Sequence, residues 1–231
     1  CWSFSALSFL ESEIMRINKL EEPIVLSEMF IVRKAYEAKA EKYIRMDGRT
    51  NFGEGGAFHD IPFVIENFGI LPRSEYTGKK KKKDVYNHGA MFEKLDSIVQ
   101  KAKAAGKGLQ ADWITAYNDV LDDDMGALPE SFKYKGVEYT PEAFDNSLNI
   151  DMGDYVSLTS FTNHKLHKSC LLQIPDNWLW EESYNVTLDE LFNATLNALK
   201  SGYSVAWGAD VSEKGFSFKN GIAIALSLIH I

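Results

Sequence analysis

The spacing of the apolar residues changes type part-way along this 231-residue chain. In the first segment, apolar side chains recur every three or four residues, which places them on one face of a helix: Phe4, Leu7, Leu10, Ile14 and Ile17. From residue 132 onward, the runs FKYKGVEYT, DYVSLTSF and YSVAWGAD alternate and are rich in aromatic and β-branched residues, as is typical of strands. Helices followed by strands favour an α+β fold in which the two kinds of element form separate layers.

Local signals place the ends of several predicted helices. Pro23 ends the first helix, and Ser27 is the expected N-cap of the second. The segment IPFVIENFGI is a short apolar helix that stops at Gly69. A last helix begins at Thr187, which forms a capping box with Glu190.

Composition and charge limit the classes of partner. With 45% hydrophobic residues the chain can bury a substantial core, and its formal net charge of -8 argues against general attraction to nucleic acid or anionic lipid. The lysine run at residues 79–83 is therefore best explained as a solvated loop insertion. No stretch of roughly 18 apolar residues predicts a membrane span. Small molecules, peptides and other proteins remain as partners.

The chain has two cysteines, Cys1 and Cys170, too few for a disulfide framework. Cys1 lies at the N-terminal end of a predicted helix, where the helix dipole and free N–H groups can stabilise a thiolate nucleophile. Three alternative roles for Cys1 stay open: a buried inert cysteine, an N-terminal nucleophile whose own amine is the base, and a lipidated first residue. Cys170 is expected to be buried and inert.

Several motifs together resemble a known family. CWSFSALSFLESE is similar to the nucleophile helix of papain-like cysteine peptidases, and LSE, GEGG and GILPRSEY follow in the family's order. The later segments ALPESFKYKGVEYTPEAF, DYVSLTSF, IPDNWLWEESYNVTLDEL and SGYSVAWGADVS resemble the bleomycin hydrolase and aminopeptidase C branch. The resemblance covers residues 1 to about 225.

The resemblance implies a papain-like α+β fold with the helical part first and an antiparallel sheet part later, incomplete at both ends. Residues 1–78 would form the helical subdomain with the nucleophile helix, and 79–130 a helical insertion typical of the branch. Residues 131–225 would begin the β-rich subdomain. The last six residues, LSLIHI at 226–231, resemble a translated sequencing adapter, so we expect that His230 is not native protein.

The resemblance also implies roles for individual residues. Cys1 would be the catalytic nucleophile, and its backbone N–H would supply half of an oxyanion hole. Gly55 and Gly56 would pair with the substrate backbone, because a peptide can approach a main chain closely only where no Cβ intervenes. Ala57 and Phe58 would wall the pocket for a substrate side chain. No cofactor and no metal site are expected.

Parts of the family's machinery have no counterpart in the sequence. The family's oxyanion-hole glutamine lies upstream of the nucleophile, and its catalytic histidine and asparagine lie well downstream. His164 and His167 precede the segment SGYSVAWGADVS, which in this branch comes before the catalytic histidine. His59 and His88 are expected on the surface or at helix caps. We therefore expect the chain as given to be catalytically inactive.

The predicted function is that of a cysteine-type aminopeptidase that hydrolyses peptide bonds through a thiol acyl-enzyme. The alternatives are an N-terminal-nucleophile amidohydrolase and a peptide-binding relative that lacks the catalytic base. The resemblance implies peptide substrates, a homo-oligomer that is hexameric in the family, and no membrane or nucleic-acid partner. A cytoplasmic location is the family's default, with an exported or periplasmic form as the alternative.

Overall fold

The computed structural model describes residues 2–80, 85–106, 112–209, 212 and 214–224. Three of our sequence predictions therefore lie outside the described residues: the nucleophile Cys1, most of the lysine run, and the tail with His230. The helices are α1 (Trp2–Asn18), α2 (Glu28–Arg45), α3 (Asp60–Phe68), α4 (Gly89–Ala104), α5 (Asp112–Met125), α6 (Pro141–Ser147) and α7 (Leu188–Lys200). The strands are β1 (Phe132–Tyr134), β2 (Val137–Tyr139), β3 (Leu158–Thr159), β4 (Lys168–Leu171), β5 (Glu182–Asn185), β6 (Phe216–Ser217) and β7 (Ile222–Ala223).

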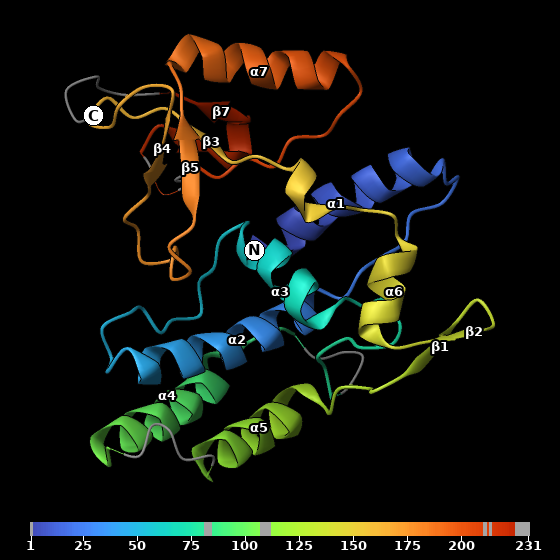
Figure 1. Cartoon of the computed structure of the whole chain (residues 1–231), viewed down its shortest axis with the longest axis vertical. Helices are drawn as coiled ribbons and strands as arrows, with labels where there is room; N and C mark the ends of the chain where they lie inside the picture. Colours follow the sequence, from blue (N-terminus) through green and yellow to red (C-terminus); the bar gives the residue numbers. More distant parts are fainter. Residues whose placement is uncertain (1, 81–84, 107–111, 210–211, 213, 225–231) are drawn as a thin grey trace.

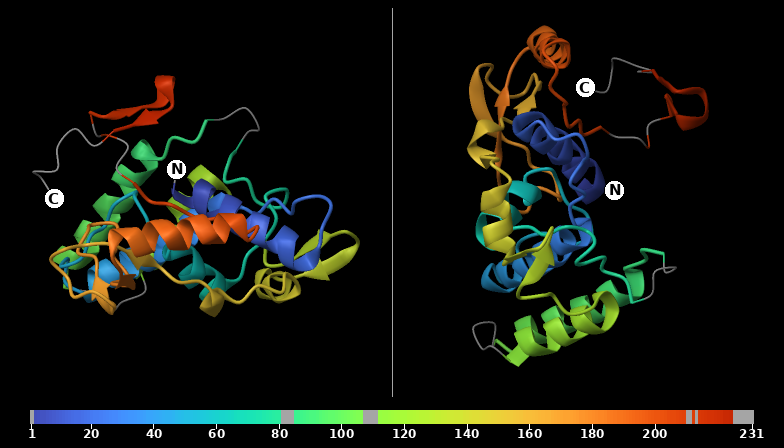
Figure 2. Two further views of the ribbon diagram at one scale, coloured as in Figure 1. Left: turned by 90° about the horizontal axis from the view of Figure 1, so that it is seen from above. Right: turned by 90° about the vertical axis from the view of Figure 1, so that its right-hand side faces the viewer.

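Most of the helices and the three-stranded sheet occupy different ends of the molecule, which confirms the α+β prediction. In Figure 1, α2, α4 and α5 lie together at the lower end, whereas β3, β4, β5 and α7 lie at the upper end. Helix α1 runs between the two ends, with its first residues close to α3 (Figures 1 and 2). The start of α1 is therefore placed where the helical and sheet parts meet.

The main apolar core belongs to the helical part. Leu7, Leu10 and Ile14 are fully buried, so the predicted stripe of α1 is confirmed, although Phe4 and Ile17 at its two ends are partly exposed. The core cluster extends from Ala6 to Met152 and includes side chains of α1 to α6. By contrast, α7 has no buried residue, and its apolar side chains Leu188, Phe192 and Leu199 are 55–70% exposed.

The predicted helix ends are mostly correct. Ser27 caps α2 by accepting a hydrogen bond from Phe30 N at 3.1 Å, and the capping box of Thr187 and Glu190 is present. Gly69 ends α3 with φ of 72°, and a Cβ there would collide with the backbone at Pro141. One boundary is wrong: α1 ends at Asn18 rather than at Pro23, because Lys19 turns into the left-handed region with φ of 51°.

The sheet differs from the prediction in two respects. The three-stranded sheet has the order β3-β5-β4 and is mixed rather than antiparallel, since β3 pairs parallel with β5 while β4 pairs antiparallel with it. The segment YSVAWGAD forms no strand among its described residues 203–209. A strand needs a neighbour for its backbone groups, and no described segment pairs with this one; its Trp207 is 78% exposed. The run FKYKGVEYT contains strands as predicted, and these form the antiparallel pair of β1 and β2.

The buried cap of α2 yields a stability prediction. The Ser27 side chain is fully buried, and besides capping α2 it donates to Tyr76 O at 2.6 Å. We expect Ser27→Ala to lower the free energy of unfolding by about 2 kcal/mol, because it removes a cap and leaves a buried carbonyl without its donor. Thr140, the exposed cap of α6, accepts only from Ala143 N and is the matched control. Urea unfolding that showed equal losses for Ser27→Ala and Thr140→Ala would contradict this.

Candidate functional site

The first turn of α1 packs against the glycine loop, residues 53–56. A Cβ on Gly56 would lie 2.6 Å from Cε2 of Trp2 and 2.7 Å from Oδ2 of Asp60, both too close for real atoms. The loop thus lies against the residue that directly follows Cys1 in the chain. Two motifs more than fifty residues apart in the sequence are brought together here.

The structure gives a packing reason for glycine at these positions, and the expected pairing with a substrate backbone stays a prediction. Neither Gly55 nor Gly56 has a positive φ, so neither is required by backbone conformation. A Cβ on Gly55 would fall inside contact distance of the Asp176 carboxylate, just as one on Gly56 would meet Trp2 and Asp60. Side chains of the protein itself therefore occupy the space into which a Cβ on either glycine would point. A large side chain at Gly56 would therefore disturb the packing of Trp2 as well as any bound peptide.

A buried lysine, Lys39 of α2, fixes the glycine loop. Its side chain is fully buried, and its ammonium donates to the carbonyls of Gly53, at 3.4 Å, and Gly55. The ammonium also lies 5.8 Å from the ring centre of Trp2 and 5.7 Å from that of Trp178. Rings and carbonyls offer negative charge density to a cation that has lost its water. Lys39 therefore ties α2, the loop and the start of α1 together.

The sequence analysis did not identify Lys39. The segment RKAYEAKAEKY that contains it is rich in charged residues, which is typical of a solvated face. The available signal was its spacing, three residues after Tyr36 and four after Ala35, both of which are buried.

Asp60, the first residue of α3, is the acidic partner of Lys39. Its carboxylate is fully buried, with Oδ2 3.9 Å from the Lys39 Nζ. Burial raises the pKa of Asp60 to about 6, and the nearby Lys39 charge opposes part of that rise. Burial likewise lowers the pKa of Lys39, and the negative charges of Asp60 and Asp176 oppose part of that fall. Above pH 6 the two groups form a buried ion pair behind the glycine loop.

His59 occupies the N-cap position of α3, one of its two predicted places, but its side chain does not cap the helix. It is half-buried and makes no side-chain capping bond to α3, and its Nε2 lies 3.7 Å from Oδ1 of Asp60. Burial first, and the Lys39 charge second, lower the pKa of His59 to about 4. At neutral pH His59 is therefore an uncharged neighbour of the ion pair.

The segment between β4 and β5 closes the other side of the site. Asn177 is buried and holds a turn, donating to Leu172 O at 3.0 Å and Glu181 O at 2.8 Å while accepting from Glu181 N at 3.0 Å. The next residue, Trp178, is also buried and meets the ring of Phe63 edge-to-face at 5.6 Å. This turn holds Asp176 against Gly55.

Ala57 and Phe58 follow the glycine loop directly. The Ala57 carbonyl accepts a hydrogen bond from Asp60 N at 3.1 Å, which begins α3. The half-buried Phe58 ring packs edge-to-face on Phe9 of α1 at 5.5 Å. Phe58 therefore packs on α1 and Ala57 lies at the start of α3, and their role as pocket walls stays a prediction.

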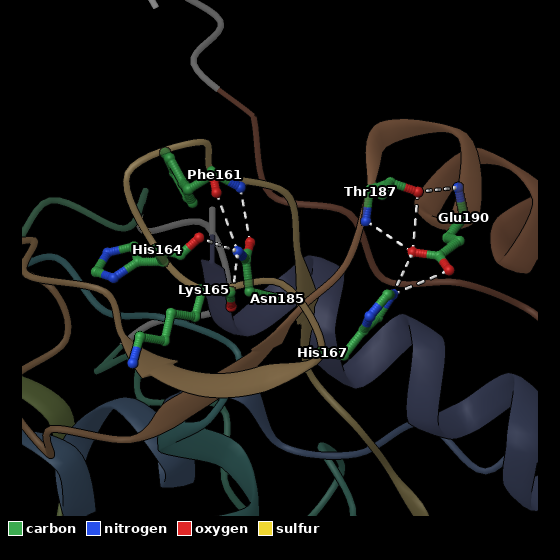
Figure 3. Close-up of polar contacts among 7 residues, drawn as sticks. All are labelled: Phe161, His164, Lys165, His167, Asn185, Thr187 and Glu190. Carbon is green, nitrogen blue, oxygen red and sulfur yellow. Dashed lines mark hydrogen bonds and ion pairs between the residues drawn. The ribbon is translucent and has the colours of Figure 1, made fainter.

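His164 and His167 belong to a separate polar network beside α7 (Figure 3). Its centre is the fully buried Asn185, which accepts from Phe161 N at 2.7 Å and donates to the carbonyls of Phe161, His164 and Lys165. His167 Nε2 lies 3.0 Å from both carboxylate oxygens of Glu190. Hydrogen bonds from the Thr187 backbone, and then from His167, lower the pKa of Glu190 to about 2. Asn185 and His167 thus hold the loop of residues 161–167 against the start of α7.

Comparison with known proteins finds a similar fold but no sequence relative. No protein-family model matches the chain, and no curated protein matches it. The crystal structure of PepW from Lactobacillus rhamnosis HN001 (DR20) is similar with a TM-score of 0.66 at 16% sequence identity, over 88% of this chain and 55% of the PepW chain. The chain therefore shares its α+β fold with PepW and spans about half of that protein's length.

Two features are absent from the described residues. No helix in them is both long and apolar enough to cross a membrane. No group of three or more His, Cys, Asp or Glu side chains in them is arranged to hold a metal ion.

The opposite pKa shifts of His59 and Asp60 predict a pH dependence. The pKa of His59 is lowered from 6.5 to about 4, so the folded state loses stability as the pH falls through that range. The pKa of Asp60 is raised from 3.8 to about 6, so the folded state loses stability as the pH rises through that range. The two effects largely cancel in the protein. Compared with the parent chain, we expect His59→Gln to have a free energy of unfolding that is higher by about 2 kcal/mol at about pH 4.5 than at about pH 7.

Denaturant unfolding at both pH values measures this difference, and Asp60→Asn is the matched control, which should shift the difference in the opposite direction. An unchanged pH dependence in both variants would contradict the assignment of these two groups.

Removing the charge of Lys39 should destabilise the fold. Lys39→Met leaves Asp60 buried without its cation, at a cost of about 3 kcal/mol near pH 7.5. Lys42→Met is the matched control one turn further along α2, where the ammonium contacts Leu179 O, the exposed ring of Trp180 and, at 5.8 Å from its centre, the ring of Trp178. We expect the control to lose about 1 kcal/mol or less in urea unfolding. Adding Asp60→Asn to Lys39→Met should recover part of the loss, and a larger loss in the double variant would refute the pairing.

Proposed function

We propose that the chain carries the nucleophile and part of the substrate cleft of a papain-like cysteine peptidase, of the bleomycin hydrolase and aminopeptidase C type. Cys1 is the nucleophile. The Cys1 thiol gives its proton to the catalytic base, its thiolate sulfur attacks the carbonyl carbon of a peptide bond, and the C–N bond breaks as the leaving amine takes that proton from the base. Water then hydrolyses the acyl-enzyme and regenerates the thiol.

The observation that carries this proposal is the packing of Gly56 against Trp2. Two of the motifs that resemble the family, Cys-Trp and the glycine pair, meet in space although they are separated by the whole of α2. Convergence of a helix start and a glycine loop is the arrangement that an extended peptide beside a helix-end thiol requires. The shared fold with PepW supports the papain-like architecture.

The remaining expectations belong to the same proposal. Peptides are the substrates, the enzyme acts as an aminopeptidase, and the complete protein assembles as a homo-oligomer in the cytoplasm. A catalytic histidine, an orienting asparagine and an oxyanion-hole glutamine complete the machinery from the rest of that protein.

The test compares the two cysteines in the complete protein that carries this chain. Cys1→Ala should abolish both hydrolysis of a fluorogenic aminoacyl amide and labelling by a thiol-directed epoxide. Cys170→Ala is the matched control, because Cys170 is a free and buried cysteine of β4. Cys170→Ala should keep both the hydrolysis of the aminoacyl amide and the labelling by the epoxide. Retained turnover in Cys1→Ala would rule out the assignment, and peptide binding without turnover in the unaltered protein would favour a non-catalytic relative.

A further inference from the structure

The Asp176 carboxylate is held at the edge of the glycine loop. It lies so close to Gly55 that a Cβ there would collide with Oδ1. The buried Asn177 fixes the turn that follows through three hydrogen bonds, and the buried Trp178 anchors it on α3. A carboxylate on such a support is already ordered before any ligand binds, so little conformational entropy is lost on binding.

Within the described residues, Asp176 makes no hydrogen bond and no ion pair of its own. It is only half-buried, so that a ligand can reach it. Lys39 interacts with it electrostatically, but the ammonium of Lys39 is taken by Gly53 O, Gly55 O and Asp60. Asp176 therefore retains its capacity to accept hydrogen bonds.

The buried and half-buried charges around the loop leave one negative charge in excess, apart from the exposed carboxylate of Glu54. Near neutral pH Lys39 contributes one positive charge, Asp60 and Asp176 contribute one negative charge each, and His59 is neutral. This excess negative charge lies on Asp176, which is half-exposed, rather than on the buried Asp60. A partly buried negative charge of this kind attracts a cation more strongly than one in open solvent does.

We propose that Asp176 forms a subsite for a cationic group of the peptide that lies along Gly55 and Gly56. The inference rests on the proposed function for the path of the peptide. Gly56 is the glycine next to Trp2, so Asp176 beside Gly55 lies about one residue further from Trp2 along an extended chain. An ammonium or guanidinium at that position would make charge-assisted hydrogen bonds to the carboxylate.

Two sources supply such a group: a lysine or arginine side chain, and the free α-amino group of the peptide. Four tripeptides with a C-terminal fluorophore separate them. They carry lysine or norleucine at one position, each with a free or an acetylated N-terminus. Binding to the 231-residue chain is measured by fluorescence anisotropy at low ionic strength, where exposed charge interactions are least screened.

We expect at least one cationic form to bind about tenfold more tightly than the doubly neutral peptide. Asp176→Asn keeps the size of the side chain and should reduce this preference to less than about twofold. Gly55→Ala leaves the carboxylate in the chain but displaces it, and should reduce the preference as well. Glu54→Gln is the matched control, because Glu54 is an exposed acid of the same loop, and it should keep the tenfold preference.

The outcomes test the Asp176 subsite and the proposed peptide cleft separately. Equal binding of all four peptides, or a preference that survives Asp176→Asn, overturns the subsite and leaves the peptide cleft standing. A preference lost equally in Glu54→Gln also overturns it, because general charge attraction would then account for the effect. If no peptide binds to the unaltered chain, the proposed peptide cleft fails and the subsite fails with it.

Discussion

The buried ammonium of Lys39 is the interaction on which the arrangement of the site depends. A lysine without access to water is costly unless carbonyls, a carboxylate or aromatic faces replace its hydration. Here these replacements come from the glycine loop, from α3 and from two tryptophans in different parts of the chain. The need to surround one cation thus fixes where the loop, the start of α1 and the β4–β5 turn lie relative to α2.

The glycine loop gains its shape from this constraint. Its carbonyls face inward toward Lys39, and both Cβ directions are filled by protein atoms. The loop is therefore pre-organised rather than adjustable, which suits a surface that binds an extended backbone. In the proposed enzyme, Lys39 acts on the substrate only through the loop, and it is a positioning residue rather than a catalytic one.

Local sequence signals predicted the helical part well, because caps and apolar spacing act over a few residues. Ser27, Gly69 and the Thr187 capping box all form as expected. The strands were predicted less well, since pairing depends on distant partners: residues 203–209 have a strand-like sequence but no described neighbour, and β3 pairs parallel with β5. The motifs of the candidate site were visible in the sequence. The buried role of Lys39 and the packing that requires Gly55 and Gly56 were not, because both depend on contacts across the fold.

The central claim is that the Cys1 thiol and the glycine loop form the two sides of one peptide cleft. A crystal structure of the complete protein after reaction with a peptidyl epoxide tests it most directly. The account predicts a covalent bond from the inhibitor to Sγ of Cys1 and main-chain hydrogen bonds between the inhibitor and Gly56. A label on Cys170, or an inhibitor backbone that runs away from the glycine loop, would contradict it.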